Sequence, residues 1–222
     1  AGREGVLRKG STMAVELTWL SHASFRLAAG GRVVYIDPWK IEGAPHDADL
    51  VIVSHEHYDH LSPDDIAKVS RADTEILAST AAVARLGRGH AASPNQTVTL
   101  AGIEVRTLPA YNPAKRFHPL SAGGLGVVIA LGGLRIYYAG DTDLIEEMGR
   151  LEHIDVALLP VGGTYTMNAA EAAQAARRIT PAVAIPYHFG DIVGTLADAE
   201  AFANAGCPVK ILQPGKTAVF GE

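Results

Sequence analysis

The chain has 222 residues, of which 48% are hydrophobic and 19% charged, so its composition excludes a disordered chain and allows a sizeable core. The formal net charge of −5 excludes the strongly basic surface that is typical of nucleic-acid-binding proteins. The single cysteine, Cys207, excludes an intrachain disulfide and agrees with a reducing compartment, so we expect a cytoplasmic protein. We find no apolar run of about 18 residues and no secretory signal, and we expect neither a membrane span nor export.

The first part of the chain alternates β-branched apolar runs with short turns, which is the pattern of strands. Residues 1–12 are polar and without periodicity, and we interpret them as a loose extension or an artificial addition ahead of one domain at 13–222. Strands are predicted at 15–20, 23–28, 32–37, 48–54 and 75–79, and helices at 62–70 and 80–87. The continuous apolar run at 48–54 indicates a strand buried on both faces.

The remainder of the chain repeats this order, with strands first and helices later. Strands are predicted at 96–100, 103–109, 125–131, 134–140, 156–160, 182–186 and 209–212, and helices at 168–179 and 196–206. This order predicts an α+β fold in which helices cover both outer faces of two packed sheets, a four-layer αββα sandwich. A doubly wound parallel sheet is the alternative, and it fits less well because residues 15–37 are typical of consecutive antiparallel strands.

Three predicted strands end in side chains that can bind metal ions. The strand at 48–54 is followed by "HEHYDH" (55–60), the strand at 134–140 by Asp141, and the segment "AIPY" by His188. Functional residues collect in the loops just past the ends of rigid strands, so these side chains are expected to form one site. Imidazole together with carboxylate is the ligand mix of zinc, and also of manganese, iron or nickel.

The spacing within "HEHYDH" indicates two neighbouring ion positions. His55 and His57 alternate as on an extended segment, so both imidazoles can bind one cation. Asp59 and His60 follow after a turn and can reach a second position. The two oxygens of Asp141 can bridge the two ions, which in dinuclear sites lie roughly 3.5–4 Å apart.

These motifs, with "SHASF", "YIDPW", "FHP" and "LLPVGGTYTM" in chain order, resemble the metallo-β-lactamase superfamily from about Val15 onward. They are most similar to its small metal-dependent hydrolases, which are related to ascorbate-6-phosphate lactonase and N-acylphosphatidylethanolamine phospholipase D. The resemblance implies a metallo-β-lactamase-like αββα fold and two divalent ions, with zinc expected first and manganese, iron or nickel as alternatives. The ligands that it implies are His55, His57, Asp59, His60, His118, Asp141 and His188, with Asp59 and Asp141 also expected to be catalytic.

For three of the expected site residues, the sequence allows two different roles. Members of the superfamily often have the remaining first-metal histidine in a Gly-His-Thr stretch, which this chain lacks. His118 is the candidate for that place, and an ordinary loop histidine is the alternative. His22 either supports a metal ligand or a bound anion by a hydrogen bond, or is structural. Asp37 either caps the turn before Pro38 or supports a metal-bound histidine.

Two further pairs of residues are candidates for contacts with the substrate. Thr164 and Tyr165 lie in a glycine-rich stretch that either lines the substrate pocket or is a plain loop before a helix. Lys115 and Arg116 either hold a substrate phosphate or are solvated.

The function implied by the resemblance is metal-dependent hydrolysis, in which a metal-bridging hydroxide attacks a small-molecule ester, lactone or phosphoester. One alternative is a phosphodiesterase that acts on lipid or nucleic acid, and another is a non-catalytic metal-binding protein. His57 stands where an electron-transferring diiron relative carries a carboxylate, which favours hydrolysis over redox chemistry. The expected partner is a small-molecule substrate and neither a membrane nor a nucleic acid, while a homo-oligomer stays open.

Overall fold

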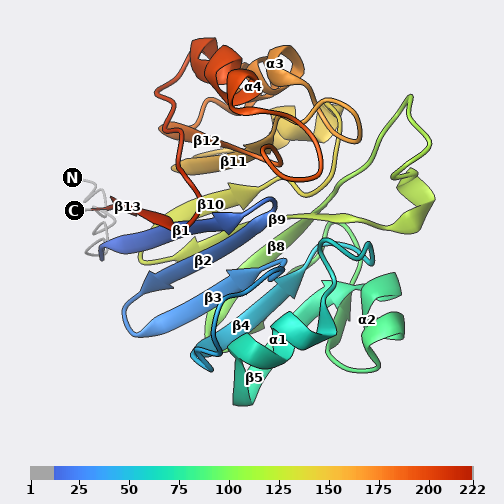
Figure 1. Cartoon of the computed structure of the whole chain (residues 1–222), viewed down its shortest axis with the longest axis vertical. Helices are drawn as coiled ribbons and strands as arrows, with labels where there is room; N and C mark the ends of the chain where they lie inside the picture. Colours follow the sequence, from blue (N-terminus) through green and yellow to red (C-terminus); the bar gives the residue numbers. More distant parts are fainter. Residues whose placement is uncertain (1–12, 222) are drawn as a thin grey trace, which may run out of the picture.

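The computed structural model describes residues 13–221, so the expectation for residues 1–12 lies outside the described residues. Two β-sheets pack face to face (Figure 1). The first sheet consists of β1 (Val15–Ser21), β2 (Ser24–Ala29), β3 (Arg32–Ile36), β4 (Ala48–Val53), β5 (Ser70–Ser79), β6 (His90–Ala92) and β13 (Lys216–Phe220). The second consists of β7 (Thr97–Leu100), β8 (Ile103–Pro109), β9 (Leu125–Leu131), β10 (Leu134–Tyr138), β11 (Val156–Pro160) and β12 (Val183–Tyr187).

The strand orders are β13-β1-β2-β3-β4-β5-β6 in the first sheet and β12-β11-β10-β9-β8-β7 in the second. Strands β1, β2 and β3 are antiparallel neighbours, as the sequence predicts for residues 15–37. The parallel neighbours are β3 to β6 in the first sheet and β10 to β12 in the second. The two packed sheets exclude a single doubly wound parallel sheet.

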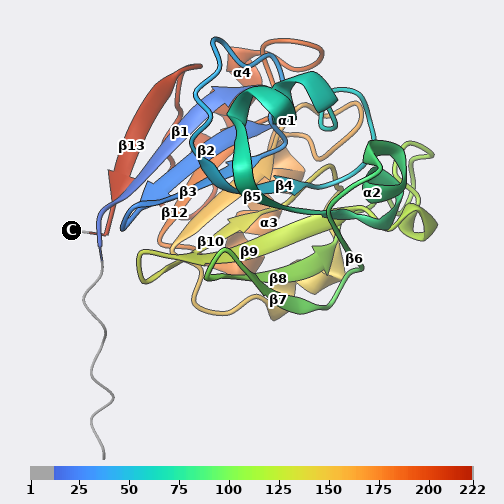
Figure 2. The same cartoon turned by 90° about the horizontal axis from the view of Figure 1, so that it is seen from below.

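Helices cover the outer faces of the two sheets. Helices α1 (Pro63–Val69) and α2 (Thr80–Leu86) lie on the first sheet, and α3 (Ala169–Ile179) and α4 (Leu196–Ala201) on the second (Figures 1 and 2). Short 3₁₀ turns complete the elements at Leu120–Ala122, Glu146–Arg150 and Phe202–Asn204. The four-layer αββα prediction is therefore confirmed.

Burial in β4 follows from this layering. All six residues of β4 are buried, because one face of the strand packs against the second sheet and the other against α1 and α2. Leu50 and Ile52 belong to the core between the sheets, whereas Val51 and Val53 contact the apolar cluster under the helices. The continuous apolar run at 48–54 thus forms a strand that is buried on both faces, as the sequence indicates.

The local signals for helix ends are largely correct. Ser62 caps α1 and Gly87 ends α2 in the left-handed conformation, while Asn168 and Glu171 form a reciprocal capping box at α3. The helix predicted at 196–206 is shorter than expected, because after Ala201 it tightens into a 3₁₀ turn, as helix C-termini often do.

The strand predicted at 209–212 is wrong. Val209 makes only an isolated bridge to Ala184, and the chain then crosses to the other sheet, where Gly215 donates its N–H to the Trp19 carbonyl at 2.7 Å. It forms β13 there, which the sequence analysis missed. Strand β13 lies at the sheet edge beside β1, and only Ala218 in it is buried, so it lacks a strong apolar pattern. Among the described helices, none is long and apolar enough to cross a membrane.

Candidate metal centre

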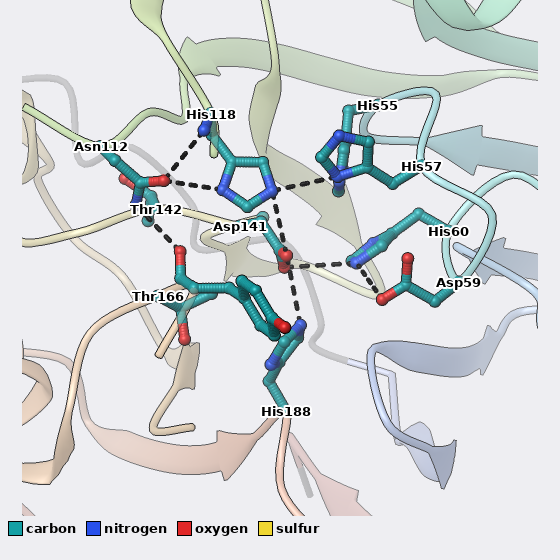
Figure 3. Close-up of polar contacts among 12 residues, drawn as sticks. His55, His57, Asp59, His60, Asn112, His118, Asp141, Thr142, Thr166 and His188 are labelled. Carbon is teal, nitrogen blue, oxygen red and sulfur yellow. Dashed lines mark hydrogen bonds and ion pairs between the residues drawn. The ribbon is translucent and has the colours of Figure 1, made fainter. Parts of the chain in front are cut away.

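The expected ligands meet at one edge of the sandwich (Figure 3). In the second sheet, the parallel register of β10, β11 and β12 brings their carboxyl ends together, so that Asp141 and His188 emerge side by side. The loop after β4 brings the 55–60 cluster from the first sheet. The Leu125 N–H donates to the Ser54 carbonyl at 3.0 Å and thereby joins the two sheets beside the site.

One group of donor atoms consists of His55 Nε2, His57 Nδ1 and His118 Nε2. The His57 nitrogen lies 3.1 Å from that of His55 and 3.2 Å from that of His118. In a tetrahedral zinc site with bonds of 2.0–2.1 Å, two ligand nitrogens are separated by roughly 3.3 Å. The three imidazoles are therefore spaced as the ligands of one ion, and His118 lies where the resemblance implies.

A second group consists of Asp59, His60 and His188, and His22 joins it. The His22 Nε2 lies 3.0 Å from Asp59 Oδ2, and the His60 Nε2 lies 3.7 Å from the same oxygen. The His22 and His188 rings are in contact, with centroids 4.1 Å apart. Of the two interpretations of His22, the structure agrees with the one in which His22 makes a hydrogen bond to an expected metal ligand, here Asp59.

Asp141 lies between the two groups. Its Oδ1 is 3.3 Å from His60 Nε2, while its Oδ2 is 3.2 Å from His188 Nε2 and 3.4 Å from His118 Nε2. The side chain is buried, so its charge is shielded little by solvent. This is the position of a carboxylate that can bind an ion on either side.

The donor set fits a metal ion, because several of its buried polar atoms lack any other partner. His60 Nε2, His188 Nε2 and Asp141 Oδ1 are buried without a hydrogen bond to any described residue, although they lie close together. Buried polar atoms without partners are rare and costly in folded proteins. Coordination to a cation would satisfy all three, so the residues present are suited to hold one.

Asp37 orients His60 from behind. The Asp37 carboxylate is fully buried and accepts hydrogen bonds from Ser54 N–H at 2.7 Å, Ser54 Oγ at 2.6 Å, His60 Nδ1 at 2.7 Å and Tyr138 Oη at 2.6 Å. The parallel register that pairs Ile36 with Ile52 places Asp37 beside Ser54. Because His60 Nδ1 donates to Asp37, the opposite ring nitrogen, Nε2, faces Asp141. The structure therefore supports the interpretation in which Asp37 supports a histidine of the site rather than capping the turn before Pro38.

The sequence analysis missed two residues that orient the first group. The Asn112 Oδ1 accepts from both the His118 backbone N–H at 3.0 Å and the His118 Nδ1 at 2.8 Å. The Ser54 hydroxyl donates to Asp37 and so accepts from His55 Nδ1 at 2.9 Å. The one signal for Asn112 is its place six residues before His118, and this spacing has no meaning without the loop's fold.

The charges of the site shift its pKa values in opposite directions. Burial lowers the pKa of His55 well below its ordinary value and also lowers the pKa values of His118 and His22. Burial opposes a charge on His60 as well, but the carboxylates of Asp141 and Asp37 raise its pKa well above the usual range. The pKa of Asp141 is well below its ordinary value, since His188 and His60 outweigh burial. The centre thus favours an ionised Asp141 beside a charged His60, whereas burial favours the neutral imidazoles of His55, His118 and His22.

Three site residues have backbones in the left-handed region, which non-glycine residues rarely adopt. Their φ angles are 45° at His22, 44° at Asp37 and 64° at His188. Each residue directly follows a strand or sits in a strand connection, where a change of chain direction turns its side chain toward the centre. Such strain is tolerated where surrounding contacts over-determine the conformation, and it clusters at functional sites.

The remaining candidates, those for contacts with the substrate, have different surroundings in the structure. Tyr165 lines the hollow beside Asp141, whereas Thr164 is exposed and is not among the residues that line it. The Lys115 Nζ donates to Asp143 Oδ1 at 2.6 Å and to the carbonyls of Thr166 and Gly163 at 2.6 and 3.2 Å. Lys115 thus ties two loops together, and its three donors are engaged.

Comparisons with known proteins agree with this geometry. The model of the β-lactamase superfamily domain matches residues 16–188. A "UPF0173 metal-dependent hydrolase" of Aeropyrum pernix is 34% identical, with 92% of this chain and 97% of that protein covered. One of Methanoregula boonei is 36% identical, with 91% and 97% covered. Igni18, a metallo hydrolase of Ignicoccus hospitalis, superposes with a TM-score of 0.78 at 27% identity, with 93% and 98% covered.

Two packed sheets with a histidine and carboxylate cluster at their shared edge define the class of protein. The chain belongs to the metallo-β-lactamase superfamily, and within it to the metal-dependent hydrolases.

Proposed function

We propose that the chain is a dinuclear hydrolase that binds two divalent ions, zinc first, and cleaves a small-molecule ester, lactone or phosphoester. The observation that carries this proposal is the position of Asp141, whose carboxylate contacts donors of both groups: Oδ1 faces His60, and Oδ2 faces His188 and His118. When bound, two such ions supply a hydroxide nucleophile near neutral pH and polarise the substrate oxygen.

The side chains of this chain have distinct tasks in the proposal. His55, His57 and His118 would hold the first ion and Asp59, His60 and His188 the second, and Asp141 would contribute its carboxylate to both. Asp37 and Asn112 keep the imidazoles of His60 and His118 in the tautomer whose Nε2 faces the centre. Asp59 is half-buried and lines a hollow, so its carboxylate is accessible to a substrate as well.

The two alternative functions have less support. A phosphodiesterase that acts on lipid or nucleic acid needs basic side chains for charged groups away from the ions, and none of the described residues that line the hollows beside Asp141 is Lys or Arg. A non-catalytic site is normally closed by four protein ligands, whereas here Asp141, His57 and His118 border open space. The proposal includes one hydrolase domain at 13–222 and a cytoplasmic location, in keeping with the free Cys207 and the acidic net charge.

The test is metal analysis combined with a turnover screen. Protein purified without chelator, or reconstituted with zinc or manganese, is expected to hold about two ions per chain and to hydrolyse a generic ester, lactone or bis(p-nitrophenyl) phosphate. Asp141→Ala should lose metal and activity together, while His153→Ala, an exposed histidine outside the site, should retain both. Failure to retain any metal after reconstitution, or full activity of chelated protein, would refute the proposal.

A further inference from the structure

Two hollows open beside Asp141 and share four lining residues. The first has a volume of about 180 Å³ and the second of about 270 Å³. Both are lined by His57, Phe117, His118 and Asp141. A substrate whose reacting bond lies at Asp141 therefore has room on both sides, although each hollow admits only a small group.

The second hollow has a wall of apolar side chains, which we name the apolar wall: Tyr58, Phe117, Tyr165 and Ile192. Three of these are among the large hydrophobic side chains that are exposed, with exposed fractions of 62% at Tyr58 and 38% at both Phe117 and Ile192. Exposed apolar side chains that gather at one place mark binding sites, whereas single ones need no explanation.

Contacts within the apolar wall and contacts to residues outside the hollow hold its aromatic side chains in place. The Phe117 and Tyr165 rings pack edge to face, with centroids 4.8 Å apart and planes at 82°. Tyr58 packs in the same manner on Trp39 at 6.1 Å. The Asn112 Nδ2 donates to the Tyr165 carbonyl at 3.0 Å, so one residue supports both His118 and this wall. The wall is therefore preorganised for a ligand.

Basic side chains are missing from the described lining of the two hollows. Among the described residues that line them, none is Lys or Arg, and Glu56 adds a carboxylate to the first. Two nearby lysines are already paired: Lys115 with Asp143, and Lys40 with both oxygens of Asp191 at 2.9 and 2.7 Å. An anionic group that lay against the apolar wall, away from the ion positions at Asp141, would lose water without gaining a Lys or Arg partner, which is unfavourable.

We propose that the substrate is a neutral molecule whose apolar acyl or aryl group lies against the apolar wall while its ester or lactone bond lies at Asp141. This inference rests on the proposed function and narrows it, because it excludes substrates with a phosphate or carboxylate on the part that enters the second hollow. Phe117, which lines both hollows, separates the two ends of the substrate.

Binding of hydroxamates to zinc-loaded protein tests the inference without turnover. These probes share one metal-binding head group and differ only in the tail. By calorimetry, hexanohydroxamate should bind at least about tenfold more tightly than acetohydroxamate, because each buried methylene favours binding and four are added. The adipic monohydroxamate, whose tail of similar length ends in a carboxylate, should bind no more tightly than acetohydroxamate.

Variants of the apolar wall sharpen the test. Ile192→Ala should reduce the advantage of the hexanoyl tail to about threefold, and Ile192→Lys should favour the carboxylate tail over the apolar one. Val219→Ala is the matched control, because Val219 is an exposed aliphatic residue on β13 that does not line either hollow. Metal content and the urea midpoint are measured for each variant, so that loss of zinc or of folding is recognised.

The outcomes separate this inference from the proposed function. Equal affinity for the three probes, or tighter binding of the carboxylate tail to the wild-type protein, overturns the inference even if esters are hydrolysed. The predicted preference in a protein that holds zinc but cleaves no ester or lactone supports the apolar wall and refutes the proposed reaction.

Discussion

At the scale of residues, the site depends on which nitrogen of each histidine carries the proton. His55, His60 and His118 each face an oxygen with Nδ1, from Ser54, Asp37 and Asn112 respectively. Each therefore turns its Nε2 toward the centre. The supporting residues therefore determine whether the imidazoles are ready to bind an ion before it arrives.

Asn112 provides a direct test of this support. Asn112→Ala should weaken binding of one ion by about 10–100-fold, because the imidazole of His118 remains but is no longer oriented. His118→Ala should weaken it at least as much, since it removes the donor atom itself. Competition with a chromophoric chelator measures both, with His153→Ala as the control. If Asn112→Ala binds two ions as tightly as the wild-type protein, the hydrogen bond to His118 does not contribute.

Asp37 should matter for stability as well as for metal binding. Asp37→Ala leaves several buried donors without an acceptor, and we expect the free energy of unfolding to fall by about 3–5 kcal/mol. Tyr138→Phe removes only one donor of this network and should cost about 1 kcal/mol. Urea denaturation of metal-free protein measures both values. Equal losses in the two variants would contradict the role of Asp37 as a shared acceptor.

At the scale of elements, the ends of the strands place the ligands. Asp141 follows β10 after the bend at Ala139 and Gly140, and Gly140 has a φ of 71°. A Cβ at Gly140 would lie 2.5 Å from the Leu125 carbonyl oxygen at the start of β9. The glycine before Asp141 thus allows two backbones to approach closely at the point where the carboxylate enters the site.

Gly140→Ala should therefore destabilise the protein and displace Asp141. We expect a loss of about 3 kcal/mol or more, the sum of an unfavourable φ and a backbone clash. Gly123→Ala is a matched control, because Gly123 has a φ of 68° but nothing within 4 Å of an added Cβ. It should cost only about 1 kcal/mol. Chemical denaturation measures stability and metal titration measures metal binding in both variants. A local clash lowers both quantities in Gly140→Ala alone, whereas a general effect of a positive φ lowers stability equally in the two variants.

At the scale of the whole molecule, the buried histidines couple folding to pH. The pKa of His55 is lowered by burial, as are those of His118 and His22, so the folded protein resists their protonation. In the unfolded chain these groups bind protons near pH ~6.5. Below this pH the unfolded state binds more protons, and stability falls as pH falls. The raised pKa of His60 acts in the opposite sense, and its contribution is lost only as pH rises through that value.

Metal-free protein should consequently become less stable as the pH falls from ~6.5 to ~5. In this window the three histidines with lowered pKa values outweigh His60, the one histidine with a raised pKa. Burial raises the pKa of Asp141, but His188 and His60 lower it by more, so Asp141 adds a further loss of stability only at lower pH. Urea midpoints in the presence of a chelator measure this dependence. A midpoint that is constant or higher at pH ~5 than at pH ~6.5 would show that these histidines do not remain neutral in the folded state.

The structure brings together the predicted side chains whose signal in the sequence is local. The 55–60 cluster, Asp141 and His188 each follow an apolar strand, so the end of the strand already indicates the sheet edge at which each side chain lies. For the same reason Ser62, Gly87 and Asn168 marked helix ends correctly. A cap is a contact within a few residues of the chain, and it needs no knowledge of the rest of the fold.

The sequence by itself determined the two-sheet architecture, the strand ends that carry the candidate ligands and the chemical type of these candidates, because these depend on apolar periodicity and on short spacings. Only the tertiary structure decided that Asn112 holds His118, that Asp37 holds His60, and that His22 joins the second group. It also decided that the chain leaves Ala184 after one bridge and adds β13 beside β1. Each of these contacts joins residues that are distant in the chain or lack a pattern of their own, so it exists only once the two sheets have packed.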